Sequence, residues 1–216
     1  MQKQLLALAL IAATGGAQAE VISFSDSYGL AVTNWTQNLT LSQFDGSLGT
    51  LNSVVINYGG QVSSIFSIES LDAAPATVSA NANANLVFGG PISNTLNISG
   101  ASSQTVSAFD GSVDFGGTSG AIIGPVVGTD SATLTLLSDL AAFIGTGTFD
   151  IAVAANGTSN ASGAGNLISQ INTQALAEIT ITYDYTVRPT VTVPEPASMA
   201  LVGLGMLGLA AVRRRK

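Results

Sequence analysis

The amino-acid sequence predicts an all-β, sandwich-like domain with at most one short helix, followed by a short hydrophobic helix at the C-terminus. Three observations support this. Apolar residues alternate with polar ones in several runs, which is the spacing of strands. Gly-rich breaks separate these runs at intervals of roughly 8–12 residues, as in sandwiches. The polar positions hold mostly Ser, Thr and Asn, whereas solvent-facing helices usually carry Lys and Glu.

The predicted strands follow in chain order. Residues 39–42 alternate and end at a turn-forming run, 44–49. Residues 51–58 and 62–71 flank Gly59 and Gly60, so they predict a hairpin. The most regular strand is 177–187, in which apolar and aromatic side chains recur at every second position. The remaining predicted strands are 77–88, 92–98, 104–109 and 151–155.

Two other local patterns have specific interpretations. Residues 136–144 have helical spacing and end at Gly145, which predicts one short helix. The tetrapeptide Phe-Asp-Gly-Ser occurs at 44–47 and again at 109–112, with unrelated flanks. We therefore expect the same kind of turn at both places.

The N-terminus has the organisation of an export signal. Lys3 precedes an apolar stretch, 5–13, and Ala17-Gln18-Ala19 gives the small-x-small pattern that signal peptidase accepts. The cut is expected between Ala19 and Glu20. The predicted organisation is a signal peptide (1–19), a β-rich domain (20–187), a Pro-containing linker (188–193) and a C-terminal segment (194–216).

The charge of the exported part limits its partners. Residues 20–193 contain twelve carboxylates and one basic residue, Arg188, which gives a formal charge of −11. Such a surface repels phosphate backbones, so nucleic-acid binding is excluded.

Missing residue types restrict catalysis. The sequence contains no His and no Cys, which excludes Ser-His and Cys-His nucleophiles and zinc or copper sites that use these ligands. Both lysines lie in the terminal segments, so a Ser-Lys pair is not available to the domain. A carboxylate pair acting as a glycoside hydrolase is the remaining enzymatic alternative. We predict a protein that is not an enzyme.

Calcium and carbohydrate are the two ligand classes that stay open. Asp110, Ser112 and Asp114 offer oxygen ligands at alternate positions, but Phe115 and Ala121 replace the Gly and Glu of a standard calcium loop. Asp110 and Asp114 are therefore weak calcium candidates, and no other cofactor is expected. Trp35, the only tryptophan, is the candidate platform for a sugar. Five N-x-S/T triplets carry no weight in a chain this rich in Asn, Ser and Thr.

The C-terminal segment has three parts. Pro194, Glu195 and Pro196 form a short motif after Val193. The apolar run that follows is shorter than the roughly 20 residues that span a bilayer. The basic end favours the cytoplasmic side, so we expect a stop-transfer element that holds the unprocessed protein in the membrane. The apolar positions are Met199, Leu201, Leu204, Leu207 and Val212, and the basic stop is Arg213, Arg214, Arg215 and Lys216.

These three parts together resemble the PEP-CTERM sorting signal of Gram-negative bacteria. The resemblance implies that a membrane-embedded exosortase with a cysteine nucleophile recognises the motif, cuts near it and removes the tail. It also implies association with exopolysaccharide and biofilm material. The expected location is therefore transient at the inner membrane and then in the cell envelope or extracellular matrix.

The body also resembles the choice-of-anchor E domain, through the stretches 33–35, 44–54, 68–70 and 145–148. That family implies a β-rich surface module and supplies no catalytic residues. The expected partners are signal peptidase, an exosortase-type enzyme, exopolysaccharide and, before processing, the membrane. The alternative to a non-enzymatic matrix protein is a carbohydrate- or calcium-binding surface module.

Overall fold

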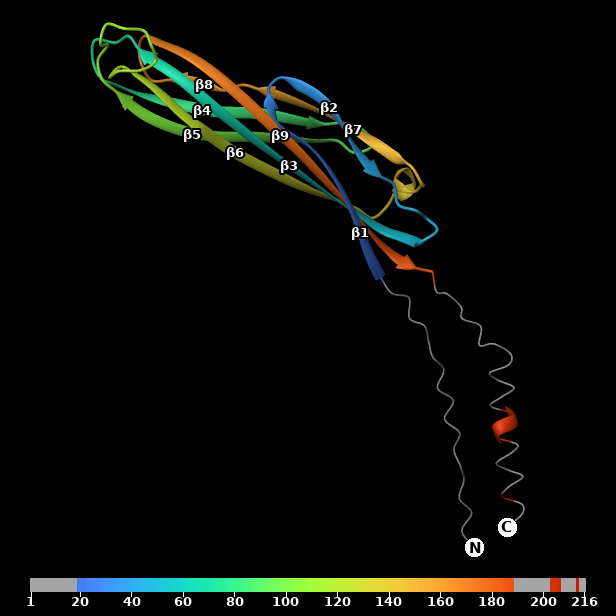
Figure 1. Cartoon of the computed structure of the whole chain (residues 1–216). Helices are drawn as coiled ribbons and strands as arrows, with labels where there is room; N and C mark the ends of the chain where they lie inside the picture. Colours follow the sequence, from blue (N-terminus) through green and yellow to red (C-terminus); the bar gives the residue numbers. More distant parts are fainter. Residues whose placement is uncertain (1–18, 189–202, 207–212, 214–216) are drawn as a thin grey trace. The chain divides into compact units, whose positions relative to one another are not determined.

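The computed structural model of the chain describes residues 19–188, 203–206 and 213. The chain divides into two units, of which one, Gln18–Val187, contains all the strands and is called the body here. Its strands form two antiparallel sheets packed face to face (Figure 1). The predicted all-β, sandwich-like fold is confirmed.

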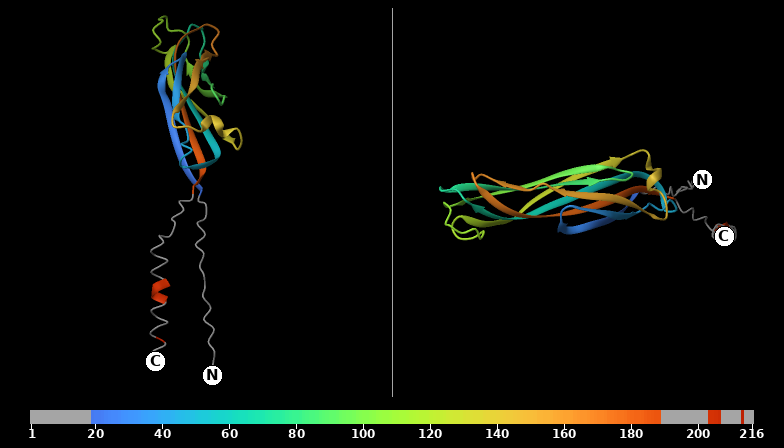
Figure 2. Two further views of the ribbon diagram at one scale, coloured as in Figure 1. Left: turned by 90° about the vertical axis from the view of Figure 1, so that its right-hand side faces the viewer. Right: turned by 90° about the horizontal axis from the view of Figure 1, so that it is seen from above.

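The strand order within each sheet mixes distant parts of the sequence, as the two further views in Figure 2 also show. Sheet A contains, from edge to edge, β1 (Ala19–Val32), β9 (Leu167–Val187), β3 (Gly49–Ser70) and β6 (Gly120–Leu136). Sheet B contains β2 (Trp35–Ser42), β7 (Thr148–Gly157), β4 (Ala76–Phe88) and β5 (Asn94–Val106), with β8 (Asn160–Ser162) also pairing with β4.

Two long strands determine the length of the body. β3 has 22 residues and β9 has 21, and they pair from Gly49 opposite Val187 to Ser70 opposite Leu167. At about 3.3 Å per residue this pair is about 70 Å long. Ala19 pairs with Thr186, so the chain enters and leaves the body at the same end. We call this the proximal end, and the opposite end, with loops 71–75, 107–119 and 163–166, the distal end.

The predicted hairpin at Gly59 and Gly60 is wrong, because both residues lie inside the single strand β3. A Cβ atom at Gly60 would lie 2.4 Å from Cδ1 of Leu86 and 2.7 Å from Cδ1 of Ile98. Glycine is therefore required here by side chains of sheet B that reach the backbone of sheet A. A sequence cannot distinguish this use of glycine from a turn.

The other predicted elements have mixed outcomes. Strand 77–88 corresponds to β4, and strand 177–187 is the second half of β9. The predicted strands 92–98 and 104–109 belong to one strand, β5, while β1, β6 and β8 were not predicted. The helix predicted at 136–144 is reduced to η1 (Leu140–Phe143), a four-residue 3-10 helix whose Phe143 is buried.

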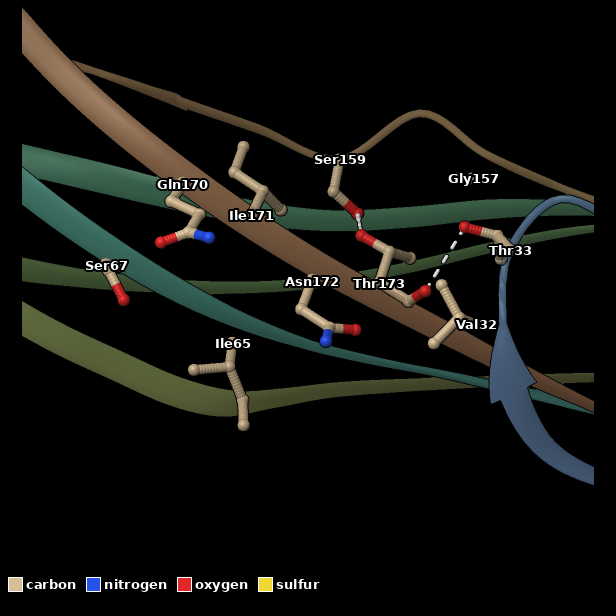
Figure 3. Close-up of a pocket in the computed structure, with 10 residues that line it drawn as sticks. All are labelled: Val32, Thr33, Ile65, Ser67, Gly157, Ser159, Gln170, Ile171, Asn172 and Thr173. Atoms are coloured by element: carbon tan, nitrogen blue, oxygen red, sulfur yellow. Dashed lines mark hydrogen bonds between the residues drawn. The ribbon is translucent and has the colours of Figure 1, made fainter.

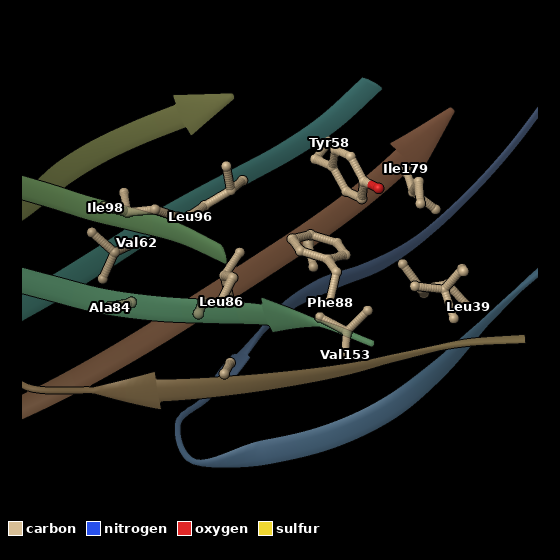
Figure 4. Packing of buried hydrophobic residues seen from close by; sticks show 14 of the residues in the cluster. Leu39, Tyr58, Val62, Ala84, Leu86, Phe88, Leu96, Ile98, Val153 and Ile179 are labelled. Carbon is tan, nitrogen blue, oxygen red and sulfur yellow. The ribbon is translucent and has the colours of Figure 1, made fainter. Parts of the chain in front are cut away.

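The core lies between the two sheets and is rich in aromatic residues (Figure 4). The ring of Tyr58 contacts that of Phe88 at a centroid distance of 5.1 Å. The hydroxyl of Tyr183 donates to the backbone oxygen of Ser42 at 2.8 Å, whereas the buried hydroxyl of Tyr58 has no partner. Burial raises the pKa of Tyr58 to about 12 and also raises that of Tyr183.

Candidate functional site

Most of the predicted sorting segment lies outside the described residues. Leu204 is in the short helical stretch 203–206 and is 67% exposed, and Arg213 is exposed as well. None of the helices in the described part of the chain has the length and apolar character needed to cross a bilayer. The predicted residues outside the described part are Val193, Pro194, Glu195, Pro196, Met199, Leu201, Leu207, Val212, Arg214, Arg215 and Lys216.

The predicted signal-peptide cut falls at the start of β1. Ala17 lies outside the described residues, whereas Ala19 and Glu20 are the first two residues of the strand. The hydroxyl of Tyr185 donates to Oε2 of Glu20 at 2.9 Å, and this hydrogen bond is the main reason that the pKa of Tyr185 is raised. A cut after Ala19 leaves Glu20 as the first residue with this contact intact. The position of the cut stays a prediction.

The two weak calcium candidates lie in the distal loop 107–119. Asp110 accepts hydrogen bonds from the backbone N–H groups of Ser112 and Thr118, both at 3.1 Å, and these bonds lower its pKa. Asp114 accepts from the backbone N–H of Gly116 at 2.8 Å. Within residues 19–188, 203–206 and 213, no three acidic side chains converge on one point. The two carboxylates form turns, and calcium binding stays a prediction.

The repeated Phe-Asp-Gly-Ser tetrapeptide makes the same side-chain hydrogen bond twice, but in two different turns. The backbone N–H of Leu48 donates to the oxygen of Asp45 at 3.0 Å in the first turn, whereas Gly111 has φ +100° in the second. The carboxylate of Asp45 accepts from the backbone N–H of Ser47 at 2.8 Å, and Asp110 accepts from Ser112 in the same way. In both turns this hydrogen bond is the largest cause of a lowered Asp pKa. A short Asp side chain that bonds the backbone two residues later is the usual chemistry of such turns.

A buried carboxylate at the distal end was not predicted. Glu69 is fully buried, because loop 107–119 covers the outer surface of sheet A beside it. Its Oε1 accepts from the hydroxyl of Ser119 at 2.5 Å, while Oε2 has no hydrogen-bond partner. No local pattern signals this burial, since strand alternation alone places Glu69 on a solvent-facing side.

Trp35 is half-buried beside Tyr28 at the edge of the core. Its ring meets that of Tyr28 edge-on at a centroid distance of 4.8 Å, and its indole Nε1 is buried without a hydrogen-bond partner. The side chain therefore mainly covers the edge of the core where β1 turns into β2. Sugar binding through Trp35 stays a prediction, and the carbohydrate alternative has a second candidate surface.

That surface is available on the outside of sheet B, where side chains carry amides and hydroxyls. Asn85 lies between Asn97 of β5 and Asn156 of β7, and its Nδ2 donates to Oδ1 of Asn97 at 2.7 Å. We call these outward-facing positions of β2, β4, β5, β7 and β8 the amide face. Asp150 is the only charged residue on it, by strand alternation.

The N-x-S/T triplets, which were given no weight, are the sequence signal for the amide face. In the three triplets that lie wholly within strands, 38–40, 97–99 and 160–162, strand alternation puts the Asn and the hydroxyl on the same side. The asparagine of every triplet is exposed, and four of the five lie in strands of sheet B. The five residues are Asn34, Asn38, Asn97, Asn156 and Asn160.

Comparison with solved structures yields only remote likenesses. The VP2 subviral particle of infectious bursal disease virus aligns at 11% identity and a TM-score of 0.18, over 93% of this chain and 50% of that one. The Gt strain of the same virus aligns at 13% identity and a TM-score of 0.11, over 98% and 53%. The chain thus spans about half the length of these proteins. TM-scores this low support no conclusion about fold or function.

Comparison with protein families identifies the C-terminus. No curated protein matches the chain. Residues 192–216 match the family described as the PEP-CTERM protein-sorting motif, which covers the predicted motif, apolar run and basic stop. The match does not extend to the body, so its resemblance to the choice-of-anchor E domain stays a prediction. The chain carries a PEP-CTERM sorting signal, and it is thereby an exported protein that an exosortase-type enzyme processes at the C-terminus.

Proposed function

We propose that this protein is a non-enzymatic component of the cell envelope or extracellular matrix of a Gram-negative bacterium. The sorting signal at residues 192–216 carries the proposal. The unprocessed tail holds the protein at the inner membrane, an exosortase-type enzyme removes the tail, and the body is retained among exopolysaccharide and biofilm material. The absence of His and Cys from the whole sequence supports a non-enzymatic role, because the common nucleophile and base pairs need these residues.

The architecture of the body suits a protein that is held by one end. β1 begins and β9 finishes at the proximal end, where Ala19 pairs with Thr186. The distal loops lie about 70 Å away along β3. An anchor at the C-terminus therefore leaves both outer faces of the sandwich accessible. A body of this kind fits the proposed choice-of-anchor type, which precedes alternative anchoring signals.

The amide face favours a second function, the binding of hydroxyl-rich polysaccharide. Amides and hydroxyls provide both donors and acceptors, as sugar hydroxyls do. Each such contact contributes only about 1 kcal/mol net, because it replaces hydrogen bonds to water. Useful retention therefore requires many contacts along one polymer, and the row Asn97, Asn85 and Asn156 offers them at the spacing of neighbouring strands.

The experiment that tests the processing proposal changes the motif. Glu195→Ala with Pro196→Ala should leave the tail attached, so that the protein accumulates in the membrane fraction with Lys216 intact. Mass spectrometry of wild-type protein from the native host should show a chain shortened by roughly the tail. Thr190→Ala, in the adjacent linker and outside the matched segment 192–216, is the matched control and should be processed normally. Surface-localised wild type with an intact Lys216 would refute processing.

A separate experiment tests the polysaccharide function. Calorimetric titration and affinity electrophoresis should detect binding of the purified body to the producer's own polysaccharide. Asn85→Ala with Asn97→Ala should weaken this binding. Asn57→Ala, an exposed amide on the outer face of sheet A, should not. Equal loss from all variants, or no binding by wild type, would contradict a role for the amide face and would leave the processing proposal intact.

A further inference from the structure

The edge strands of the two sheets contact each other at two places on the long sides of the sandwich. β5 and β6, the edge strands on one side, approach so closely that a Cβ at Gly128 would lie 2.3 Å from the backbone oxygen of Ser99. On the other side, near the proximal end, the carboxylate of Asp26 in β1 accepts from the backbone N–H of Thr40 in β2 at 2.7 Å. These contacts join the two sheets along their edges.

The distal third of β9 has an edge without a strand partner in the described part of the chain. β1 pairs with β9 only as far as Val32 opposite Gln174, and then turns away. The backbone oxygen of Thr173 still accepts from the N–H of Thr33 at 3.0 Å. Beyond it, residues 167–172 pair with β3 on one side, and no described strand pairs with them on the other. We call residues 167–172 the free edge.

Half of the backbone groups of the free edge point away from β3. Because the N–H and C=O of every second residue point to the same side of a strand, Ile171 and Ser169 face the same way as the oxygen of Thr173. The side chain of Ser169 is exposed and that of Ile171 is half-buried. A hollow of about 410 Å³ lies along this edge, with Val32 and Thr33 at one end (Figure 3). A strand added here would lie beside β9 in the position that β1 occupies nearer the proximal end.

The free edge lacks the devices that usually prevent pairing with another chain. Edge strands are commonly protected by Lys, Pro, bulges or other charged side chains. Residues 167–172 contain no charged residue and no Pro, and the register between β3 and β9 is unbroken along them. The uncharged stretch is longer still, since no charged residue occurs between Asp150 and Glu178.

We propose that the free edge pairs with the free edge of a second copy of this chain, in an antiparallel, two-fold symmetric dimer. The charge of the body favours this edge as the place where two copies meet. The body contains twelve carboxylates and no basic residue, so two bodies with a formal charge of −12 each repel one another over most of their surface. An uncharged edge is where they can approach.

Antiparallel pairing about a two-fold axis is self-complementary, so one edge is sufficient for both partners. With the axis at Ser169, this residue pairs with its own copy, and Leu167 pairs with Ile171 of the copy. The three pairs form about six backbone hydrogen bonds. The distal parts of the two A sheets become one continuous sheet. This inference concerns assembly and does not depend on the processing or polysaccharide proposals.

Sedimentation of the body, residues 20–188, tests the dimer, since these residues contain the whole core and form a separate unit. Wild type should show a monomer–dimer equilibrium. Ser169→Pro should raise the dissociation constant by roughly tenfold to a hundredfold, because it removes an outward N–H that β3 does not use. Ser169→Asp should act in the same direction by placing two carboxylates opposite each other. Ser131→Asp, an exposed position on the outer face of β6, is the matched control.

Hydrogen exchange identifies the surface involved. The amides of Ser169 and Ile171 should exchange more slowly as protein concentration rises, and circular dichroism should confirm that each variant is folded. A wild type that remains monomeric at every accessible concentration overturns the proposal. So does a dimer that Ser169→Pro and Ser169→Asp leave unchanged, or one in which those two amides exchange at the same rate as in the monomer.

Discussion

The pair Gly59 and Gly60 provides a direct test of how the two sheets pack. The residues are adjacent in β3, so their Cβ atoms would point to opposite sides of sheet A. At Gly60 a Cβ would meet Leu86 and Ile98 at 2.4 and 2.7 Å, and these two side chains are almost fully buried. At Gly59 the atom met is Oε1 of Glu178 at 2.5 Å, at the end of an exposed and flexible side chain.

The same substitution should therefore have opposite effects at the two positions. Gly60→Ala overpacks the core and should cost about 1–3 kcal/mol of unfolding free energy. Gly59→Ala displaces only a surface carboxylate, while it lowers the entropy of the unfolded chain, so it should be neutral or stabilise by up to about 1 kcal/mol. The body has more than 150 residues, so each 1 kcal/mol should shift Tm by about 2–4 °C.

Chemical denaturation of residues 20–188, followed by circular dichroism, measures both free energies. A common slope of the unfolding transition is required before the values are compared. If Gly59 and Gly60 formed the turn of a hairpin, both substitutions would be destabilising. Equal destabilisation, or a Gly60→Ala variant as stable as wild type, would refute the packing described here.

Three further predictions concern hydroxyl and carboxyl groups, and denaturation or thermal melting of the same fragment measures each one. Tyr183→Phe should cost about 1 kcal/mol because it removes the hydrogen bond to Ser42, whereas Tyr58→Phe should cost nothing, because its buried hydroxyl has no partner. Because burial raises the pKa of Tyr58 to about 12, folding favours its neutral form, so the free energy of unfolding should be unaffected by this group below about pH 10 and should fall as the pH rises toward 12. Tyr58→Phe should reduce this fall, and the raised pKa of Tyr183 should account for part of the remainder. If Asp110 and Asp114 bind calcium, millimolar calcium should raise Tm, and Asp110→Ala with Asp114→Ala should abolish the rise; a wild-type Tm that does not respond to calcium removes the site.

The sequence predicted strands well where alternation was unbroken. β4 and the second half of β9 have a buried residue at every second position over ten or more residues, so their period is clear. β1 has the same signal, because Ile22, Phe24 and Tyr28 pack against the core, and it could have been predicted. The alternation in β1 was not used for a prediction, because this strand directly follows the predicted signal peptide.

Where prediction failed, glycine and proline served purposes that a sequence does not reveal. β6 contains Gly124-Pro125, a pair that favours a turn in the sequence but is tolerated here because β6 is an edge strand. In the structure Gly124 has φ +127° and the pair lies at a register shift, where Val126 is opposite Ser64 and Ile123 is opposite Phe66. Gly128 is needed because β5 approaches closely. These are tertiary requirements, so local patterns could not distinguish them from turns.

The candidate sites also differ in how far local sequence patterns could predict them. The sorting signal is a contiguous segment with its own order of parts, so the sequence was sufficient to identify it. The burial of Glu69 depends on a loop about 40 residues further along the chain, and no local pattern reports it. The amide face is intermediate, because its N-x-S/T triplets are visible in the sequence but only the strand pairing gathers them on one sheet.

The distribution of charge gives self-association a characteristic dependence on salt. The carboxylates that repel two bodies lie outside the free edge, so the dimer contains long-range repulsion and no compensating ion pair at its centre. Screening at 1 M salt shortens the Debye length to about 3 Å and removes most of this repulsion. The dimer should therefore strengthen as salt is raised, whereas a dimer held by ion pairs should weaken. Sedimentation at low and high salt distinguishes the two cases, and weakening by salt would show that charged residues, rather than an uncharged strand edge, hold the copies together.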